Sequence, residues 1–300
     1  MVIRSFTELE RALKGSRPLR PAVAGAADPA VLEALAEAQA RGLIVGAFLA
    51  DDAALLRPML PPGMRVEIAD THDPAAVAVA EVRAGRADVL VKGRVDSAAY
   101  LRAVVARETG LRASATLSNL TLAEMPGLDR LIGATDNGIV PLPTLDQKRA
   151  MILNAVPLFR GLGVTPLRVA AIAASEKVSA SQPATADASA LATEAAAGQI
   201  SGALVDGPFG YDVALSAAAA TKKGLASAVA GRADLILFPS IEAGNATVKA
   251  WKLHGHARTA SLVLGGRVPI LLNSRADGAE QRWLGLLLAA ALRAGQAAAL

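Results

Sequence analysis

AGRADLILFPSIEAGNATVKAW, at residues 230–251, is the stretch that decides the fold. Its apolar run at 235–238 has the length of a buried strand, and the polar turn after it leads into a helix predicted over 245–253. The same order of strand, turn and helix recurs along the chain. Such alternation predicts a mostly parallel sheet with helices on both faces, which is the α/β fold class.

The other elements follow from the same patterns. Strands are predicted at residues 22–25, 43–49, 65–68, 88–92, 130–134, 168–173, 203–205, 262–264 and 268–272. Helices are predicted at residues 7–13, 29–41, 52–59, 74–84, 97–108, 145–162, 185–198, 214–221 and 278–294. Asp28-Pro29 and Asp73-Pro74 mark two helix starts, because aspartate caps the first turn and proline suits the first helical position.

A proline-containing break at residues 139–144, IVPLPT, interrupts the alternation just before a long predicted helix. We therefore expect one α/β lobe over residues 1–144 and a second lobe over 145–275. The last predicted helix is apolar around most of its circumference, which is typical of a buried helix. We expect the segment 276–300 to pack back onto the first lobe or into a subunit interface.

The composition excludes several classes of protein. Hydrophobic residues make up 53% of the chain and charged residues 19%, which is typical of a globular protein. The chain has no cysteine, which excludes disulfides, thiolate nucleophiles and cysteine-based metal sites. Aromatic residues make up only 3%, and the formal net charge of +4 is dispersed, so we expect no nucleic-acid partner.

Neither end of the chain predicts a membrane or export segment. The longest uncharged run near the end, residues 283–292, is shorter than the roughly 20 residues of a spanning helix. The first residues, MVIRSFTELERALK, carry charges throughout and lack the apolar region of a signal peptide. We expect a cytoplasmic protein without a membrane partner.

Common nucleotide-binding and hydrolase motifs are missing from the sequence, which contains no G-x-G-x-x-G, no Walker A loop and no G-x-S-x-G. His254 and His256 flank a glycine, but no acidic residue stands near them at metal-site spacing. We therefore predict no metal site.

Polar residues gather where the predicted strands end, and ligands of open α/β sheets bind in the crevice outside those ends. The residues that we expect to bind substrate are Lys92, Gly93, Ser118, Asn119, Lys177, Thr185, Asp206, Glu242, Asn245 and Lys249. Taken singly, each cluster is also explained as a turn or a helix start. Ser274-Arg275 differs, because a hydroxyl and a guanidinium just before a helix N-terminus offer several donors to one anion.

At these clusters the chain resembles the phosphate acetyl/butyryltransferase family, and most closely its phosphate butyryltransferase branch. The matching strings are EKVSASQPATADA (176–188), LVDGPFGYDVALS (204–216), residues 230–251 quoted above and VPILLNSRAD (268–277). VLVKGRVDSAAYL (89–101) and LDQKRAMILNAV (145–156) match more weakly, and the first 80 residues match only in their α/β pattern. The resemblance implies a homodimer of the two-lobed isocitrate/isopropylmalate dehydrogenase fold, with its site in the cleft between the lobes.

The resemblance also implies a reaction. Acyl-CoA and phosphate would give acyl phosphate and CoA, by direct attack in a ternary complex. CoA is then a substrate, and no tightly bound cofactor is required. Because phosphate is itself a nucleophile, the missing cysteine is no obstacle to this chemistry.

Residues 274–280 would carry the catalytic roles. We expect Arg275 to clamp the phosphoryl group or the polarised carbonyl, and Ser274 to donate to the thioester sulfur or the oxyanion. In the reverse direction a carboxylate can act as general base for the CoA thiol. Asp277 and Glu280 are the candidates for this base, although the position nearest to the family's spacing is Gln281.

Two departures from the family pattern leave alternatives open. Ser118-Asn119 stands where relatives have Ser-His, and residues 135–140 also differ from the usual run. The alternatives are a different enzyme on the same fold and a CoA- or acyl-phosphate-binding protein that has lost catalysis.

Overall fold

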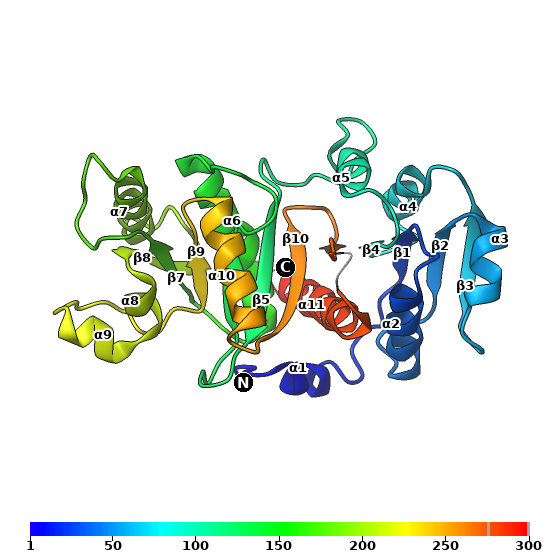
Figure 1. Ribbon diagram of the computed structural model, residues 1–300, viewed down its shortest axis with the longest axis horizontal. Helices are drawn as coiled ribbons and strands as arrows, with labels where there is room; N and C mark the ends of the chain where they lie inside the picture. The colour runs from blue at the N-terminus through cyan, green and yellow to red at the C-terminus, as the bar shows by residue number, and fades with distance from the viewer. Residues whose placement is uncertain (275–276, 299–300) are drawn as a thin grey trace. The chain divides into compact units, whose positions relative to one another are not determined.

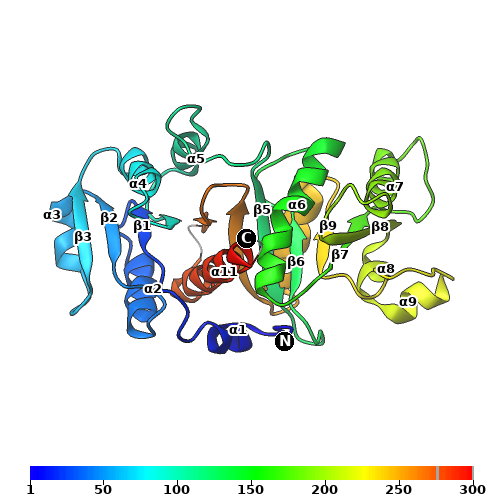
Figure 2. The ribbon, with the colours of Figure 1, turned by 180° about the vertical axis from the view of Figure 1, so that it is seen from behind.

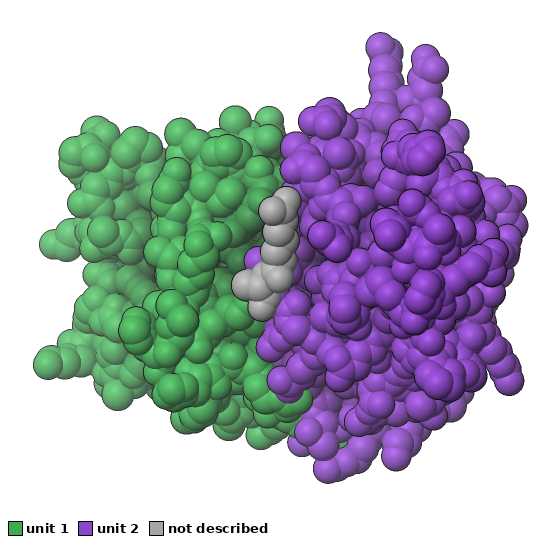
Figure 3. Space-filling model, turned by 45° about the vertical axis from the view of Figure 1, so that its right-hand side comes forward, with its two compact units in different colours: residues 1–5, 114–259, 295–300 green, residues 6–113, 260–294 purple. Residues whose placement is uncertain are grey.

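The structure is a computed structural model that describes residues 1–274 and 277–298, and the chain divides into two compact units (Figure 3). Unit 1 comprises Met1–Ser5, Ser114–Thr259 and Gly295–Leu300. Unit 2 comprises Phe6–Ala113 and Ala260–Ala294.

Unit 2 contains a sheet with the strand order β3-β2-β1-β4-β11-β10, in which only the pairing of β10 with β11 is antiparallel. The strands are β1 (Pro21–Ala24), β2 (Ala47–Asp51), β3 (Val66–Asp70), β4 (Val89–Lys92), β10 (Arg258–Leu264) and β11 (Ile270–Leu271). The helices are α1 (Phe6–Ala12), α2 (Pro29–Ala40), α3 (Ala53–Leu56), η1 (Arg57–Met59), α4 (Pro74–Arg83), α5 (Ser97–Val105) and α11 (Ala279–Ala297).

Unit 1 contains strands in the order β5-β6-β9-β7-β8, of which β6, β9, β7 and β8 run parallel. The strands are β5 (Ser118–Glu124), β6 (Ile132–Thr135), β7 (Leu167–Ile172), β8 (Ala203–Phe209) and β9 (Leu235–Leu237). The helices are α6 (Leu145–Gly161), α7 (Pro183–Ala196), α8 (Tyr211–Leu215), α9 (Ala217–Lys222) and α10 (Ile241–Leu253). Opposite views show α10 in front of these strands in Figure 1 and α6 in front in Figure 2, so the two helices cover opposite faces.

The predicted helix starts are confirmed at Asp28 and Asp73. The Asp28 side chain accepts the backbone N–H groups of Ala30 and Val31, and the Asp73 side chain accepts that of Ala76. Each aspartate is followed by a proline at the first helical position, where the missing N–H is not needed. These local signals place α2 and α4 without reference to the rest of the chain.

Strand β5 corrects one prediction. Ser118 and Asn119 were expected to end a strand, but they begin β5, which runs antiparallel to β6. The register Thr121↔Ala134 brings the start of β5 beside the end of β6. The two residues therefore still lie at the edge where the parallel strands of unit 1 end.

Two other elements differ from expectation. The single helix predicted at 214–221 is divided into α8 and α9, because the Ser216 side chain caps α9 by accepting the Ala219 N–H at 3.2 Å. Strand β8 continues through Asp206, which was expected to follow the strand. The pairing of β7 with β8 shifts register at this point, between Ala170 and Ile172.

The division into units differs from the expected boundary at residue 144. Residues 114–144 lie in unit 1, because β6 pairs with β9 from Gly133↔Leu235 to Thr135↔Leu237. In the same way β11 lies in unit 2, because it pairs with β4. The prolines of the 139–144 break therefore stand in a loop inside unit 1, just before α6.

The last helix buries its apolar side chains within the single chain. Its large apolar side chains that are at least nine-tenths buried are Trp283, Leu284, Leu286, Leu287, Leu288 and Leu292. The burial of α11 therefore needs no second subunit to explain it. No helix among residues 1–274 and 277–298 is long and apolar enough to cross a bilayer.

Candidate active site

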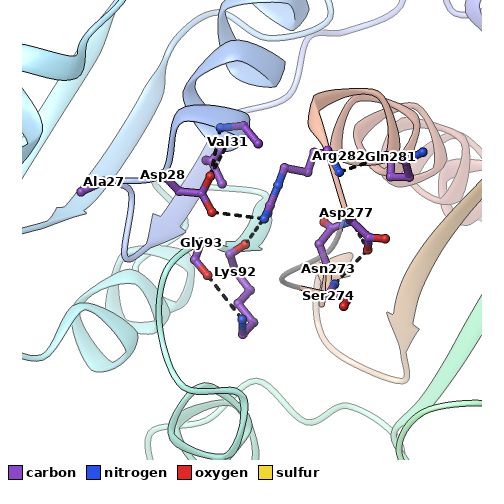
Figure 4. Close-up of polar contacts among 12 residues, drawn as sticks. Ala27, Asp28, Val31, Lys92, Gly93, Asn273, Ser274, Asp277, Gln281 and Arg282 are labelled. Atoms are coloured by element: carbon purple, nitrogen blue, oxygen red, sulfur yellow. Dashed lines mark hydrogen bonds and ion pairs between the residues drawn. The ribbon is translucent and has the colours of Figure 1, made fainter.

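The ends of β4 and β11 form one edge of the unit 2 sheet. These strands are parallel neighbours in the register Leu271↔Val91, so the residues that follow each strand emerge side by side. Lys92 ends β4, and Asn273 and Ser274 follow β11. Two clusters that stand far apart in the sequence are thus brought together, as Figure 4 shows.

Gly93 is required by a close approach of two backbones. A Cβ atom at this position would lie 2.0 Å from the carbonyl oxygen of Gly25. The Gly93 N–H donates to the carbonyl of Ala24 at 2.9 Å, and the Arg94 N–H donates to that of Gly25 at 2.6 Å. The chain after β4 is therefore packed directly on the chain after β1.

Lys92 places a positive charge inside this edge. Lys92 is 2% exposed, and its Nζ donates to the carbonyl of Gly93 at 3.3 Å. Burying an ammonium group is costly unless polar or anionic groups surround it. A buried cation at the ends of parallel strands is well suited to hold an anion.

The segment after β11 is shaped by Asp277. One of its carboxylate oxygens accepts the Ser274 N–H at 2.9 Å and the Asn273 Nδ2 at 3.4 Å. The Ser274 side chain is exposed, and Asp277 is half-buried. Arg275, the expected clamp, lies outside the described residues.

Glu280 stands in the first turn of α11 and is exposed. Gln281, at the position nearest to the family's spacing for the base, accepts the Gly278 N–H through its Oε1 at 3.1 Å. An amide cannot take a proton from a thiol, so Gln281 acts here as a cap for the helix start. Asp277 and Glu280 stay as the two candidates for a general base.

Arg282 is a residue that the sequence reasoning missed. It is 4% exposed, and its Nη1 donates to the Lys92 carbonyl at 3.1 Å while its Nη2 contacts Asp28 Oδ2 at 3.2 Å (Figure 4). The other oxygen of Asp28 caps α2. The available signal was a single charge that interrupts the apolar side of the last helix, in QRWLGLLL at 281–288.

Unit 1 has its own polar cluster at the edge where its parallel strands end, and we call it the amide cluster. It consists of Asn119, Thr121, Asp136, Asn137 and Asn245. Asn119 Nδ2 donates to Asn137 Oδ1 at 2.8 Å, and Asn137 Nδ2 donates to Thr121 Oγ1 at 2.9 Å. Asn245 Nδ2 donates to the Asn137 carbonyl at 3.1 Å.

Asp136 lies at the centre of the amide cluster and is 1% exposed. Its carboxylate accepts the backbone N–H groups of Gly138, Ile139, Asn119 and Val140, at 2.6, 2.9, 3.1 and 3.4 Å. Burial raises the pKa of Asp136 above its ordinary value, and these four hydrogen bonds oppose the rise. Sequence reasoning identified Asn119 and Asn245 but missed Asp136 and Asn137, which stand in the run that departs from the family pattern.

The other predicted binding residues of unit 1 do not join the amide cluster. Thr185 Oγ1 accepts the Ser179 N–H at 2.9 Å and donates to the Gln182 carbonyl at 2.7 Å, so it shapes the start of α7. Asp206 accepts a hydrogen bond from the Ser227 hydroxyl. Lys177 is exposed.

Two further predicted residues, Glu242 and Lys249, lie on the exposed side of α10. Hydrogen bonds from its own backbone N–H and from the Ser240 side chain lower the pKa of Glu242. Ser118 is fully buried, and its Oγ has no hydrogen-bond partner among the described residues. Within the same described parts of the chain, no three His, Asp or Glu side chains gather closely enough to hold a metal ion.

A family model described as phosphate acetyl/butaryl transferase matches residues 49–290. The phosphate butyryltransferase of Clostridium acetobutylicum is 35% identical over 295 residues, which are 96% of this chain and 98% of that protein. The phosphate acetyltransferase of Rhizobium meliloti is 36% identical over 304 residues, which are 98% of this chain and 96% of that protein.

Solved structures agree on the fold. A phosphotransacetylase from Streptococcus pyogenes has a TM-score of 0.82 at 19% identity, over 98% of this chain and 99% of that one. A putative 4-hydroxythreonine-4-phosphate dehydrogenase from Salmonella typhimurium has a TM-score of 0.58 at 13% identity, over 92% of this chain and 100% of that one. The expected α/β class with mostly parallel strands, of dehydrogenase type, is confirmed.

Proposed function

We propose a function on the premise that this chain belongs to the phosphate acetyl/butyryl transferase family. It transfers a short acyl group reversibly between CoA and inorganic phosphate. The observation that carries the proposal is the match of the family model over residues 49–290, a range that includes Lys92 and the segment 273–281. A buried cation and an exposed hydroxyl at one sheet edge support the binding of an anionic substrate there.

The chemical step is a direct displacement. A phosphate oxygen attacks the thioester carbonyl carbon, the new C–O bond forms, and the C–S bond breaks to release the CoA thiolate. The enzyme must hold two anionic reactants in line, and such positioning can lower a barrier by about 7–11 kcal/mol.

We assign the roles at the unit 2 edge as follows. Arg275 clamps the phosphoryl group or the carbonyl oxygen, since a guanidinium offers a planar fork to such oxygens. Ser274 donates its exposed hydroxyl to the sulfur or to the oxyanion. Lys92 and Gly93 hold the phosphate side, and Asp277 or Glu280 takes the thiol proton in the reverse direction.

The experiment is a thiol-release assay on the purified chain with C2 to C5 acyl-CoA substrates. We expect CoA release from at least one of them that requires phosphate and continues in the presence of EDTA. If no acyl-CoA of this set releases CoA in a phosphate-dependent way, the proposed transfer is wrong. The same panel reports the preferred acyl length.

Finer properties belong to the same proposal. We expect CoA to act as a substrate without a tightly bound cofactor, and the chain to work in the cytoplasm as a homodimer. The dimer is supported by the family resemblance and not by α11, because that helix is already buried in one chain. Light scattering at micromolar concentration would distinguish a dimer from a monomer.

A further inference from the structure

Helix α11 carries two arginines that reach aspartates at opposite edges of the unit 2 sheet. Arg282, in its first turn, contacts Asp28, which follows β1. Arg293 contacts Asp88 at 2.8 Å, and Asp88 precedes β4. One pair therefore lies where the parallel strands end and the other where they begin.

The arginine at the carboxyl edge also holds a strand carbonyl. Arg282 donates through Nη1 to the Lys92 carbonyl and through Nη2 to Asp28, so one buried guanidinium joins three segments. These segments are the end of β4, the start of α2 and the start of α11. Figure 4 shows the Arg282 side chain reaching the Asp28 carboxylate and the backbone carbonyl of Lys92.

The backbone at Lys92 has little freedom to move independently of this contact. Arg282 holds the Lys92 carbonyl, and the next residue, Gly93, is pressed against Gly25 and accepts a hydrogen bond from Lys92 Nζ. Arg282 also stands eight residues after Ser274 on the same continuous segment. Its guanidinium thus links the Lys92 backbone to the segment that carries Ser274.

Two buried polar atoms at this edge have no partner among the described residues. They are Nε of Arg282 and Oδ1 of Asn273. Both residues are at least 95% buried. Both atoms have almost no exposed surface, so the Arg282 guanidinium and the Asn273 amide are enclosed at this edge.

We infer that Arg282 is a positioning residue for the phosphate substrate. It acts through Lys92 and Asp28 and does not itself contact the reacting atoms. By fixing the distance between Lys92 and the Ser274 segment, it sets the geometry in which both bind one phosphate group. This inference rests on the proposed acyl transfer.

The test is a double-mutant cycle with Arg282→Met and Lys92→Met, measured in the thiol-release assay. We expect Arg282→Met to raise the KM for phosphate by about tenfold or more, because small misplacements of binding groups are costly, and to change the KM for acyl-CoA by less than about twofold. In the Lys92→Met background the same substitution should change the KM for phosphate by less than about twofold, since the two residues act through one another. Independent, multiplying effects would overturn the inference.

Two further variants keep the test decisive. Arg293→Met removes the matched ion pair at the other edge and should leave both KM values unchanged, whatever it does to the melting temperature. Arg282→Lys keeps the positive charge, but its single ammonium group cannot reach both the Lys92 carbonyl and the Asp28 carboxylate. This variant should fold, because the buried charge is retained. It should still raise the KM for phosphate. A wild-type KM in Arg282→Lys, or the same rise in Arg293→Met, would also overturn the inference.

The failure of the proposed function looks different from the failure of this inference. If the wild type releases no CoA with phosphate, the acyl transfer is wrong. The role of Arg282 is then read from the phosphate-dependent rise in melting temperature, which should be present in the wild type and Arg293→Met and lost in Arg282→Met. Equal rises in all three proteins would reject it.

Discussion

The polar groups at the carboxyl ends of the parallel strands differ between the two units. The edge of unit 2 holds two buried basic residues, Lys92 and Arg282, and Arg282 contacts the carboxylate of Asp28. The edge of unit 1 holds one buried carboxylate, Asp136, which is surrounded by backbone N–H groups and neutral amides. A cationic edge is suited to an anionic substrate, whereas a carboxylate that accepts four N–H groups is suited to fix a loop.

The largest expected effect is on catalysis at the unit 2 edge. Arg275→Lys should lower kcat by roughly 10²–10³-fold, because loss of one charge-assisted contact to a developing oxyanion typically costs about 3–4 kcal/mol. The thiol-release assay measures the loss, and the melting temperature should stay unchanged. Ser274→Ala should lose less, since a neutral donor contributes less than a charged one. Near-normal turnover in Arg275→Lys would show that the cationic edge works without this guanidinium.

The backbone contact that closes the same edge gives the next effect. Gly93→Ala should destabilise the protein by about 3 kcal/mol, because its Cβ would overlap the Gly25 carbonyl and overpacking against backbone is not easily relieved. Urea unfolding measures the loss. Gly278→Ala is the control, since its Cβ would come no closer than 3.6 Å to Gln281. Equal stability of the two variants would mean that the loops after β1 and β4 yield freely.

A smaller effect, a loss of stability in unit 1, is expected from a substitution in the amide cluster. Asn119→Ala leaves the buried Asn137 Oδ1 without its donor at 2.8 Å, which typically costs about 1–3 kcal/mol. Asn154→Ala removes a hydrogen bond to the Thr116 carbonyl at a half-buried position and should cost less. Urea unfolding compares them. A smaller loss for Asn119→Ala would contradict a structural role for the amide cluster.

The smallest effect is a pH dependence that comes from Asp136. Its folded pKa is raised by burial, so the folded protein binds more protons than the unfolded chain between the ordinary pKa of about 3.9 and the raised value. The stability that Asp136 contributes is fully present below that ordinary pKa and is lost as the pH rises through the folded pKa. The unfolding free energy of the wild type relative to Asp136→Asn should therefore fall from pH 4 to pH 7, by about 1.4 kcal/mol for every pH unit that separates the folded from the unfolded pKa. A relative stability that rises with pH would show that the four N–H groups outweigh burial.

Local signals in the sequence were sufficient to predict much of the fold. Asp28-Pro29 and Asp73-Pro74 mark the starts of α2 and α4 by themselves. The alternation of strand and helix patterns was sufficient to predict the parallel strands. β5 was not found as a strand because the alternation implies parallel pairing, and the antiparallel partner of β6 is decided by tertiary contact. The unit boundary was missed for the same reason, since it depends on which strands pair.

The candidate site was predictable where polar residues directly follow a strand. Lys92, Ser274 and Asp277 meet at one edge because the register of β4 and β11 is fixed by their buried apolar residues. Arg282 was not predictable in this way, because its partners lie 190 and 254 residues away in the sequence. In the sequence Asp136 stands out only as part of a run that departs from the family pattern, and its burial is a property of the folded unit.

Unit 2 is built from two separate segments of the chain, and this has a consequence for synthesis on the ribosome. Residues 6–113 are made before residues 114–259, but β4 has β1 on one side only until β11 and α11 are made after both segments. Until then β4 is an edge strand with unpaired backbone groups, the kind of surface at which nascent chains associate wrongly. The long second segment of unit 1, Ser114–Thr259, contains all of that unit's strands and is complete before β11 appears. Unit 2, whose first segment precedes residues 114–259, is therefore completed after the strands of unit 1, and Lys92 meets Ser274 only once β11 has been made.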